Sequence, residues 1–291
     1  MASPVADVSA VGAVDPTGFD WNAILTAAVT SEVCEELVSK GYVVVDGALG
    51  STAAHLLRRE VEALSTSGGL LPHMFRFGSS TLRKPFIWEA DLHDTERLAP
   101  FDLAGFRGLF SSLAFPRALA RHLPDLALAC REDGVTLKIQ RNEGQGGCFP
   151  LHYDNPGPPN KRALTCLVYL NEGWAAANGG ELELRPLFEA PVALAPIMDR
   201  LVVFRSDRVL HRVLPSFAND RNPFGRFCFT VWVDGGAVNG PDEVNLTAKH
   251  IDLSLAVADA GNAGLTSPEA GAATGRDGDG GKGGGAKAPA E

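Results

Sequence analysis

A histidine and an aspartate stand two residues apart at His152 and Asp154, and a second histidine, His211, follows far downstream. On a strand, residues i and i+2 point to the same face, so the first imidazole and the carboxylate would project together. His211 comes after the apolar run 201–204 and a turn predicted at 206–207. Because the two histidines are far apart along the chain, the three side chains can meet only through a folded sheet.

Two histidines and one carboxylate, with no evident fourth protein ligand, would form a facial triad. Such a triad leaves open positions on a metal and is typical of non-heme Fe(II) oxygenases. The pattern His-x-Asp is common by itself, and a surface turn with a hydrogen-bonded histidine is the simpler alternative. Either histidine alone would more often be a core or surface residue. The strand that follows His211 favours the metal site.

That strand runs over residues 226–233, and its period of two places one set of side chains on a single face. The set is Arg226, Cys228, Thr230 and Trp232. If this face lines a barrel interior, the arginine needs an anion, because a buried charge without a partner is too costly to keep. A guanidinium binds a carboxylate through two hydrogen bonds, and the distal carboxylate of 2-oxoglutarate is one such group. A protein carboxylate is the alternative partner. Arg221 is the rival arginine, but it precedes the turn sequence 222–225, so we expect it on a loop.

These residues belong to a longer set of motifs. The set comprises 152–156 (HYDNP), 165–171 (TCLVYLN), 179–182 (GGEL), 199–204 (DRLVVF), 206–208 (SDR), His211 and 226–232 (RFCFTVW). In this order the chain resembles the 2-oxoglutarate- and Fe(II)-dependent prolyl 4-hydroxylases, and most closely those that act on hypoxia-inducible factor. The resemblance spans roughly residues 135–235, with a weaker likeness back to 41–46. An ordered set of this kind is more specific than any single motif.

The resemblance implies roles for individual residues. His152, Asp154 and His211 would hold Fe(II), Arg226 would fix the distal carboxylate of 2-oxoglutarate, and Tyr169 would donate its hydroxyl to the same carboxylate, with Thr230 nearby. The family places Arg162 and Trp232 at the substrate mouth, although packing explains both equally well. O2 would be the second co-substrate and ascorbate a further cofactor. The implied reaction is hydroxylation of a prolyl residue in a protein or peptide, with release of succinate and CO2.

The chain departs from the family pattern at two places. The segment between His211 and Arg226 is longer than in the hypoxia-type enzymes, and the stretch 140–144 lacks the tyrosine expected there. Both departures lie near the mouth of the site, so they bear on peptide-proline specificity. The same oxygenase chemistry on a nucleobase or small metabolite therefore stays open, as does a jelly roll that keeps the triad without turnover and acts as a binding module.

Composition narrows the setting. The net charge is −9 and no run of lysine or arginine is present, which argues against broad nucleic-acid binding. The five cysteines are odd in number and lack a Cys-x-x-Cys pair, which favours a reduced, intracellular setting, cytoplasmic or nuclear, over a zinc or disulfide framework. We expect no signal peptide and no membrane span. Composition does not address the oligomeric state.

The elements expected along the chain give an α+β, mainly β fold, a double-stranded β-helix (jelly roll) with N-terminal helices packed on one sheet. Residues 1–18 form a flexible lead, 19–134 a helical N-terminal part, 135–236 the jelly roll, 237–259 a C-terminal extension with a possible helix at 244–257, and 260–291 a disordered Gly/Ala-rich tail. Within the helical part we expect one helix over 21–39 ended by Gly41, a helix capped by Ser51 or Thr52, and a helical stretch over 101–123 broken by Pro116. Strands are expected at 43–45, 82–91, 137–140, 162–169 and 180–184, and a flexible glycine loop at 144–147.

Overall fold

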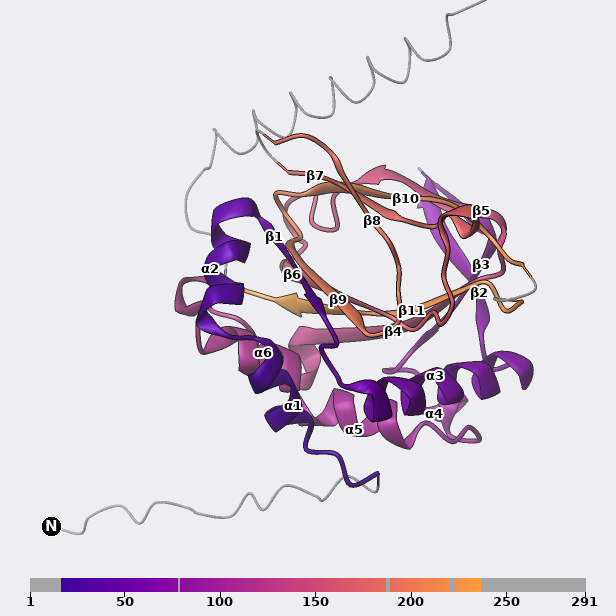
Figure 1. Ribbon diagram of the computed structural model, residues 1–291, viewed down its shortest axis with the longest axis horizontal. Helices are drawn as coiled ribbons and strands as arrows, with labels where there is room; N and C mark the ends of the chain where they lie inside the picture. The colour runs from indigo at the N-terminus through magenta and orange to yellow at the C-terminus, as the bar shows by residue number, and fades with distance from the viewer. Residues whose placement is uncertain (1–16, 78, 187–188, 220–222, 237–291) are drawn as a thin grey trace, which may run out of the picture. The chain divides into compact units, whose positions relative to one another are not determined.

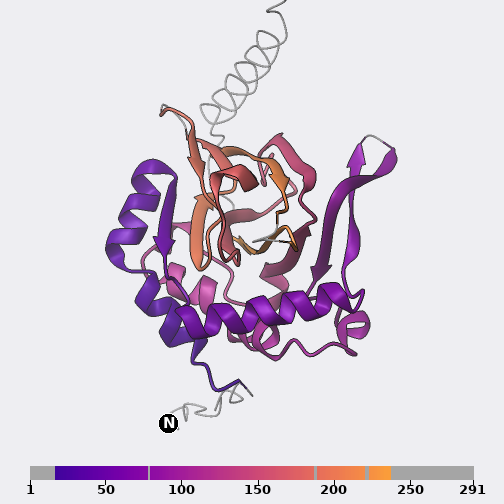
Figure 2. The ribbon, with the colours of Figure 1, turned by 45° about the vertical axis from the view of Figure 1, so that its right-hand side comes forward.

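Two β-sheets face each other, and a layer of helices covers the outer face of the larger sheet (Figures 1 and 2). The computed structural model describes residues 17–77, 79–186, 189–219 and 223–236. The seven-stranded sheet has the order β1-β9-β6-β11-β4-β3-β2, and the four-stranded sheet has the order β5-β10-β7-β8. All the pairings are antiparallel. The expected jelly roll with helices on one sheet is confirmed.

The bounds of the elements follow the chain in order. The helices are α1 (Trp21–Ala28), α2 (Ser31–Lys40), α3 (Ser51–Thr66), α4 (Thr95–Leu98), α5 (Ala104–Ser112) and α6 (Ala114–Ala120). The strands are β1 (Tyr42–Asp46), β2 (Leu71–Phe77), β3 (Ser80–Asp91), β4 (Val135–Asn142), β5 (Gln145–His152), β6 (Arg162–Tyr169), β7 (Leu182–Arg185), β8 (Val192–Leu194), β9 (Arg200–Arg205), β10 (Leu210–Phe217) and β11 (Arg226–Asp234). Residues 19–134 thus contribute β1, β2 and β3 to the large sheet as well as helices. The expected features at 1–16 and 237–291 lie outside the described residues.

The first helical stretch is divided, which corrects the expectation of one helix over 21–39. Thr30 accepts a hydrogen bond from the Val33 backbone N–H at 3.4 Å and so begins a second helix at Ser31. Gly41 ends that helix in the left-handed conformation with φ of 80°, as expected.

Two other helix boundaries also differ from expectation. Ser51 is the first residue of α3 instead of its cap, and Gly50 occupies the cap position without a side-chain hydrogen bond. The break between α5 and α6 falls at Leu113, which adopts a φ of 53°, and Pro116 lies inside the first turn of α6. Proline is tolerated in a first helical turn because the N–H groups there have no partner within the helix.

The glycine-rich stretch before His152 is a strand, not the expected flexible loop. Only Gly144 lies in the turn, where its φ is 77°, and Gly146 and Gly147 belong to β5. β5 ends at His152, so Asp154 lies just beyond the strand. The strand β2 was not expected, because its alternation is interrupted by Pro72 and His73.

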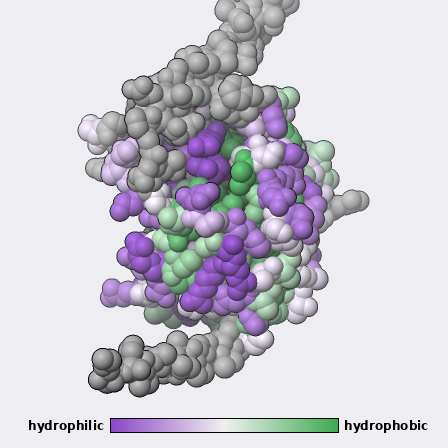
Figure 3. Space-filling model, turned by 90° about the vertical axis from the view of Figure 1, so that its left-hand side faces the viewer, coloured by the Kyte–Doolittle hydropathy of each residue, from purple (hydrophilic) through white to green (hydrophobic). Residues whose placement is uncertain are grey.

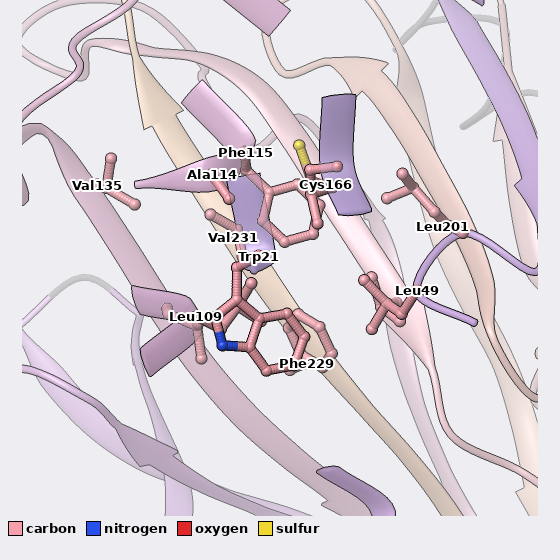
Figure 4. Close-up of a cluster of buried hydrophobic side chains, with 14 of the residues drawn as sticks. Trp21, Leu49, Leu109, Ala114, Phe115, Val135, Cys166, Leu201, Phe229 and Val231 are labelled. Atoms are coloured by element: carbon pink, nitrogen blue, oxygen red, sulfur yellow. The ribbon is translucent and has the colours of Figure 1, made fainter. Parts of the chain in front are cut away.

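The side chains on the two faces of β11 belong to two different apolar clusters. Phe227, Phe229 and Val231 pack toward the helices, and Cys228 packs between the sheets. Figure 4 shows the first cluster, in which Trp21 of α1 lies beside Phe229 and Val231. Each large apolar side chain buried in this way contributes about 1.5–3 kcal/mol. This packing fixes which face of β11 is turned toward the four-stranded sheet.

The outer surface is more polar than the two buried clusters. The face at the left of Figure 1 carries mainly polar side chains, with apolar ones gathered toward its centre (Figure 3). Among the described residues, no helix combines the length and apolar character required to cross a membrane.

Candidate active site

The two histidines meet across neighbouring strands of the four-stranded sheet. β5 and β10 pair antiparallel with His152 opposite His211, and the centroids of the two rings are 4.2 Å apart. His211 is buried, and it packs at 4.6 Å against the Phe204 ring of β9. Strand pairing therefore brings together two residues that are far apart in the sequence.

Asp154 completes the triad from the segment that follows β5. Its Oδ1 lies 3.5 Å from Nε2 of His152, and its Oδ2 lies 3.8 Å from Nε2 of His211. One nitrogen or oxygen atom from each of the three residues lies within 4.8 Å of the others. The spacing allows one metal ion to be bound by all three side chains.

The backbone sets the tautomer of both histidines. Nδ1 of His152 lies 2.8 Å from the Pro150 carbonyl, and Nδ1 of His211 lies 3.2 Å from the Val209 carbonyl. A carbonyl oxygen can only accept, so each Nδ1 carries the proton and donates it. Each Nε2 is left with its lone pair, and this arrangement orients a histidine as a metal ligand.

The carboxylate of Asp154 is also oriented by its neighbours. Its Oδ2 accepts a hydrogen bond of 2.7 Å from the Thr165 hydroxyl and one of 2.9 Å from the Trp232 indole N–H. The Arg162 guanidinium stacks on the Trp232 ring at 4.3 Å. Trp232, expected at the substrate mouth, therefore contacts the triad directly. Thr165 is a site residue that the sequence does not predict, because a strand threonine carries no signal of its tertiary partner.

Burial and charge act against each other in this triad. Burial alone would raise the pKa of Asp154, but His211, His152 and the Trp232 indole outweigh it and hold the pKa well below its usual range. Burial lowers the pKa of His211 to about 4, although the charge of Asp154 opposes this. At neutral pH the triad thus offers a carboxylate and a neutral imidazole at His211, the forms that bind metals.

A buried guanidinium lies on the facing sheet. Arg226 is 4% exposed, and its Nε and Nη2 have no hydrogen-bond partner. Its guanidinium lies 4.9 Å from the ring centroid of Tyr169, whose buried hydroxyl is also without a partner. Unsatisfied buried donors of this kind are rare, and a cation among them indicates a missing anion.

Gly180 makes room for this arginine. A Cβ placed on Gly180 would come 2.9 Å from Cδ of Arg226 and 3.0 Å from the Ser216 side chain, and the φ of 74° also favours glycine. The glycine pair 179–180 belongs to one of the sequence motifs, but its contact with Arg226 could not be deduced from the sequence.

The structure also places two other residues predicted from the sequence. Thr230 is buried on the same face of β11 as Arg226, and Arg162 begins β6. Arg221 lies outside the described residues.

The stretch that lacks the family tyrosine places Asn142 beside the turn, where its side chain donates to the Gly147 carbonyl at 2.6 Å and accepts from the Gly144 N–H at 3.1 Å. The amide of Asn142 is thus used to hold the β4–β5 turn.

The donor set fits a non-heme iron and a dicarboxylate co-substrate. The triad provides two neutral nitrogens and one carboxylate oxygen, and the orphaned donors of Arg226 and Tyr169 fit a carboxylate. A double-stranded β-helix with these two features on facing sheets defines the class of metal- and 2-oxo-acid-dependent oxygenases.

The comparisons with known proteins give the family. The model of the 2OG-Fe(II) oxygenase superfamily matches residues 137–234. A crystal structure of a prolyl 4-hydroxylase from Phytophthora capsici is 42% identical with a TM-score of 0.65, over 76% of this chain and 68% of that one. The chain belongs to the 2OG-Fe(II) oxygenase superfamily. The family implies Fe(II), 2-oxoglutarate and O2 as metal and co-substrates.

Three further relatives also resemble the chain. A prolyl hydroxylase from Trichoplax adhaerens, solved with a peptide fragment of the hypoxia-inducible factor oxygen degradation domain, is 25% identical with a TM-score of 0.60, over 80% of this chain and 98% of that one. The hypoxia-inducible factor prolyl hydroxylase of Caenorhabditis elegans is 29% identical over 70% of this chain. The chain spans 28% of the length of that relative and 36% of the length of the mouse prolyl hydroxylase EGLN3, to which it is 41% identical over 31% of its own length.

Proposed function

We propose that the protein is an Fe(II)- and 2-oxoglutarate-dependent dioxygenase that hydroxylates a prolyl residue in a protein or peptide. The observation that carries the proposal is the triad of His152, Asp154 and His211 facing a buried arginine with unpaired donors. The prolyl part rests on the relatives, several of which are prolyl hydroxylases by name.

In this proposal the triad holds the metal. His152 and His211 would bind Fe(II) through Nε2, because each Nδ1 donates to a backbone carbonyl. Asp154 would bind it through Oδ1, because its Oδ2 already accepts hydrogen bonds from Thr165 and Trp232. Three protein ligands on one side leave the other coordination positions to co-substrates.

The facing sheet would hold 2-oxoglutarate. Arg226 would bind the distal carboxylate through Nε and Nη2, and Tyr169 would donate its hydroxyl to the same group. Thr230, buried two residues before Trp232, would complete the wall between this carboxylate and the metal. The apolar cluster between the sheets excludes water around these groups, which strengthens each charge-assisted hydrogen bond.

The oxidising chemistry is supplied by Fe(II), O2 and 2-oxoglutarate when they are bound, with release of succinate and CO2. The protein would bind and orient these groups, and Nδ1 of each histidine, held by a backbone carbonyl, leaves Nε2 for the metal. We assign Arg162 to the primary substrate, because its guanidinium stacks on Trp232 beside the triad. Ascorbate would serve as the reductant that keeps the iron ferrous. An intracellular setting is supported by the five unpaired cysteines.

The test is a search for oxygenated products. The full chain is incubated with a panel of proline-containing peptides, nucleosides and a metabolite extract, with and without Fe(II) and 2-oxoglutarate, and products that gain one oxygen atom are identified by mass spectrometry. We expect oxygen on a prolyl ring in a peptide, and none with the Asp154→Ala variant. Oxygen on a nucleobase or metabolite instead would contradict the prolyl assignment, and no 2-oxoglutarate decarboxylation under any condition would indicate a non-catalytic binding module.

A further inference from the structure

A group of charged side chains lies beside the triad without a role in the chemistry described so far. His73 of β2, Glu89 of β3 and Lys138 of β4 form a connected cluster. Nδ1 of His73 lies 2.7 Å from one oxygen of Glu89, and Nζ of Lys138 lies 3.0 Å from the other. All three side chains are mostly buried, with exposures of 17%, 16% and 24%.

Strand register places this cluster on the site side of the large sheet. Lys138 pairs with Thr230 across β4 and β11. Directly paired residues point to the same face of a sheet, so Lys138 shares the face of Thr230 and Trp232. At the His73 end of the cluster, the His73 ring contacts the Phe149 ring edge-on, with centroids 5.4 Å apart. The Phe149 ring in turn stacks on His152, with centroids 6.4 Å apart. The cluster therefore borders the triad.

A fourth charged side chain, Lys84, also lies against Phe149. Nζ of Lys84, on the β2–β3 hairpin that projects at the right of Figure 2, lies 3.6 Å from the centroid of Phe149. Within the described ranges no carboxylate pairs with this ammonium. Burial lowers the pKa of Lys84 to about 8, and Cys148 and Glu89 are near enough to oppose that lowering. A nearby anion would restore the charged form of this lysine.

The balance of these groups determines what they can bind. Both oxygens of Glu89 are occupied by His73 and Lys138, so Glu89 has little capacity left for a ligand. The remaining donors are the N–H bonds of Lys84 and Lys138 that carry no hydrogen bond. Two lysines around one carboxylate leave an excess of positive charge, on a protein whose net charge is −9.

We infer that Lys84 and Lys138 form a subsite that binds an acidic side chain of the peptide substrate, next to the residue that is oxidised, while His73 holds Glu89. The inference rests on the proposed function, because it presumes a peptide substrate. Burying an ion cluster is often less stabilising than apolar packing at the same position, which favours a binding role for these charges over a purely structural one.

The experiment uses two peptides that are identical except at the positions flanking a central proline, which are glutamate in one and glutamine in the other. Binding to the full chain is measured by fluorescence anisotropy under nitrogen with Fe(II) and 2-oxoglutarate, because turnover cannot proceed without O2. We expect wild type to bind the glutamate peptide roughly tenfold more tightly than the glutamine peptide, the usual scale for a charge-assisted hydrogen bond.

Variants assign the preference to this subsite. Lys84→Met keeps the length and apolar stem of the side chain and should remove most of the preference, as should Lys138→Met, with melting temperatures checked for both. The matched control is Lys40→Met, an exposed lysine of α2 paired with Glu36, which should keep the preference. Equal binding of the two peptides by wild type, no binding of either, or an unchanged preference in both lysine variants would overturn the inference.

Turnover in air tests the proposed function separately. A glutamate preference that depends on Lys84, without hydroxyproline formation, would support the subsite and contradict prolyl hydroxylation. Hydroxylation of both peptides with the same KM in wild type and Lys84→Met would support the activity and overturn the subsite.

Discussion

The indole N–H of Trp232 donates a hydrogen bond of 2.9 Å to Oδ2 of Asp154, the carboxylate of the proposed metal triad. The aromatic residue near the end of β11 thus contacts the proposed iron site, while its ring supports the Arg162 guanidinium at 4.3 Å. One side chain therefore connects the residue assigned to the substrate with a residue assigned to the metal.

This contact predicts that Trp232→Phe weakens metal binding. Phenylalanine keeps an aromatic surface for Arg162 but cannot donate to Asp154. Loss of such an orienting partner lowers metal affinity or activity by roughly tenfold to a hundredfold. Anaerobic calorimetry with Fe(II) measures the change, and Thr165→Val, which removes the other donor to Asp154, should act in the same direction. An unchanged iron affinity with a raised peptide KM would assign Trp232 to the substrate alone.

The triad itself gives the second prediction. His152→Ala, Asp154→Ala and His211→Ala should each abolish Fe(II) binding and turnover, since each removes one of three protein ligands. His55→Ala, an exposed histidine of α3, is the matched control and should bind iron like wild type. Calorimetry that shows wild-type iron affinity in any of the three variants would remove that residue from the site.

The third prediction concerns the buried guanidinium. A charge-assisted hydrogen bond to a buried carboxylate contributes about 1.5–3 kcal/mol, so Arg226→Ala should raise the KM for 2-oxoglutarate by roughly tenfold or more. Iron affinity should stay the same. Because wild type leaves Nε and Nη2 of Arg226 unpaired, 2-oxoglutarate should raise its melting temperature, and the variant should lose most of that increase.

Arg221→Ala is the comparison for this arginine. It should leave 2-oxoglutarate binding nearly unchanged, because the turn sequence after it predicts a loop position. If Arg221→Ala raised the KM for 2-oxoglutarate while Arg226→Ala did not, the anion site would have to be built from that loop instead of β11.

The sequence predicted the parts of the site that depend on local period. Alternation along β11 placed Arg226, Thr230 and Trp232 on one face, and the structure turns that face toward the four-stranded sheet. The jelly roll could also be predicted, because apolar strand patterns and the turns between them can be read directly from the sequence. The ligand types predicted that His152 and His211 meet, and the family resemblance supported this, but their pairing across β5 and β10 is known only from the structure.

Contacts between distant segments could not be predicted in this way. The hydrogen bond from Thr165 to Asp154 and the cluster of His73, Glu89 and Lys138 depend on which strands become neighbours. The strand β2 was missed for a local reason, since Pro72 interrupts its alternation. The helix boundary at Thr30 was also missed, because apolar spacing continued across a residue whose hydroxyl caps a new helix.

The fourth prediction concerns stability and a cap supplied from another helix. Leu103 occupies the N-cap position of α5, and its side chain has no acceptor for the first backbone N–H groups of the helix. The buried Glu60 of α3 accepts these bonds instead, from Gly105 at 2.7 Å and Phe106 at 3.1 Å. Glu60→Ala leaves these buried donors without that acceptor and should cost about 2–4 kcal/mol of unfolding free energy in urea denaturation.

Two variants give the comparison for Glu60. Glu60→Gln keeps one acceptor oxygen and should cost less than Glu60→Ala. Glu36→Ala removes an exposed pair with Lys40 and should cost no more than about 0.5 kcal/mol. Equal losses for Glu60→Ala and Glu36→Ala would show that the carboxylate of Glu60 is not a cap.

The last prediction concerns Glu89 and acid. Burial alone would raise its pKa, but the hydrogen bonds and charges of His73 and Lys138 outweigh burial and lower the pKa of Glu89 to about 2. The folded pKa therefore lies below the unfolded value of about 4.3, so the unfolded chain binds more protons between these two values. Stability contributed by the carboxylate is fully present above the unfolded value and is lost as pH falls through the folded value. The difference in unfolding free energy between wild type and Glu89→Gln should be larger at pH ~5 than at pH ~2, and should shrink as pH falls through this range. Urea denaturation of both proteins across this range measures the difference, and the titrations of groups that do not interact with Glu89 cancel. A difference that does not change with pH in this window would show that Glu89 is not held as a carboxylate by His73 and Lys138.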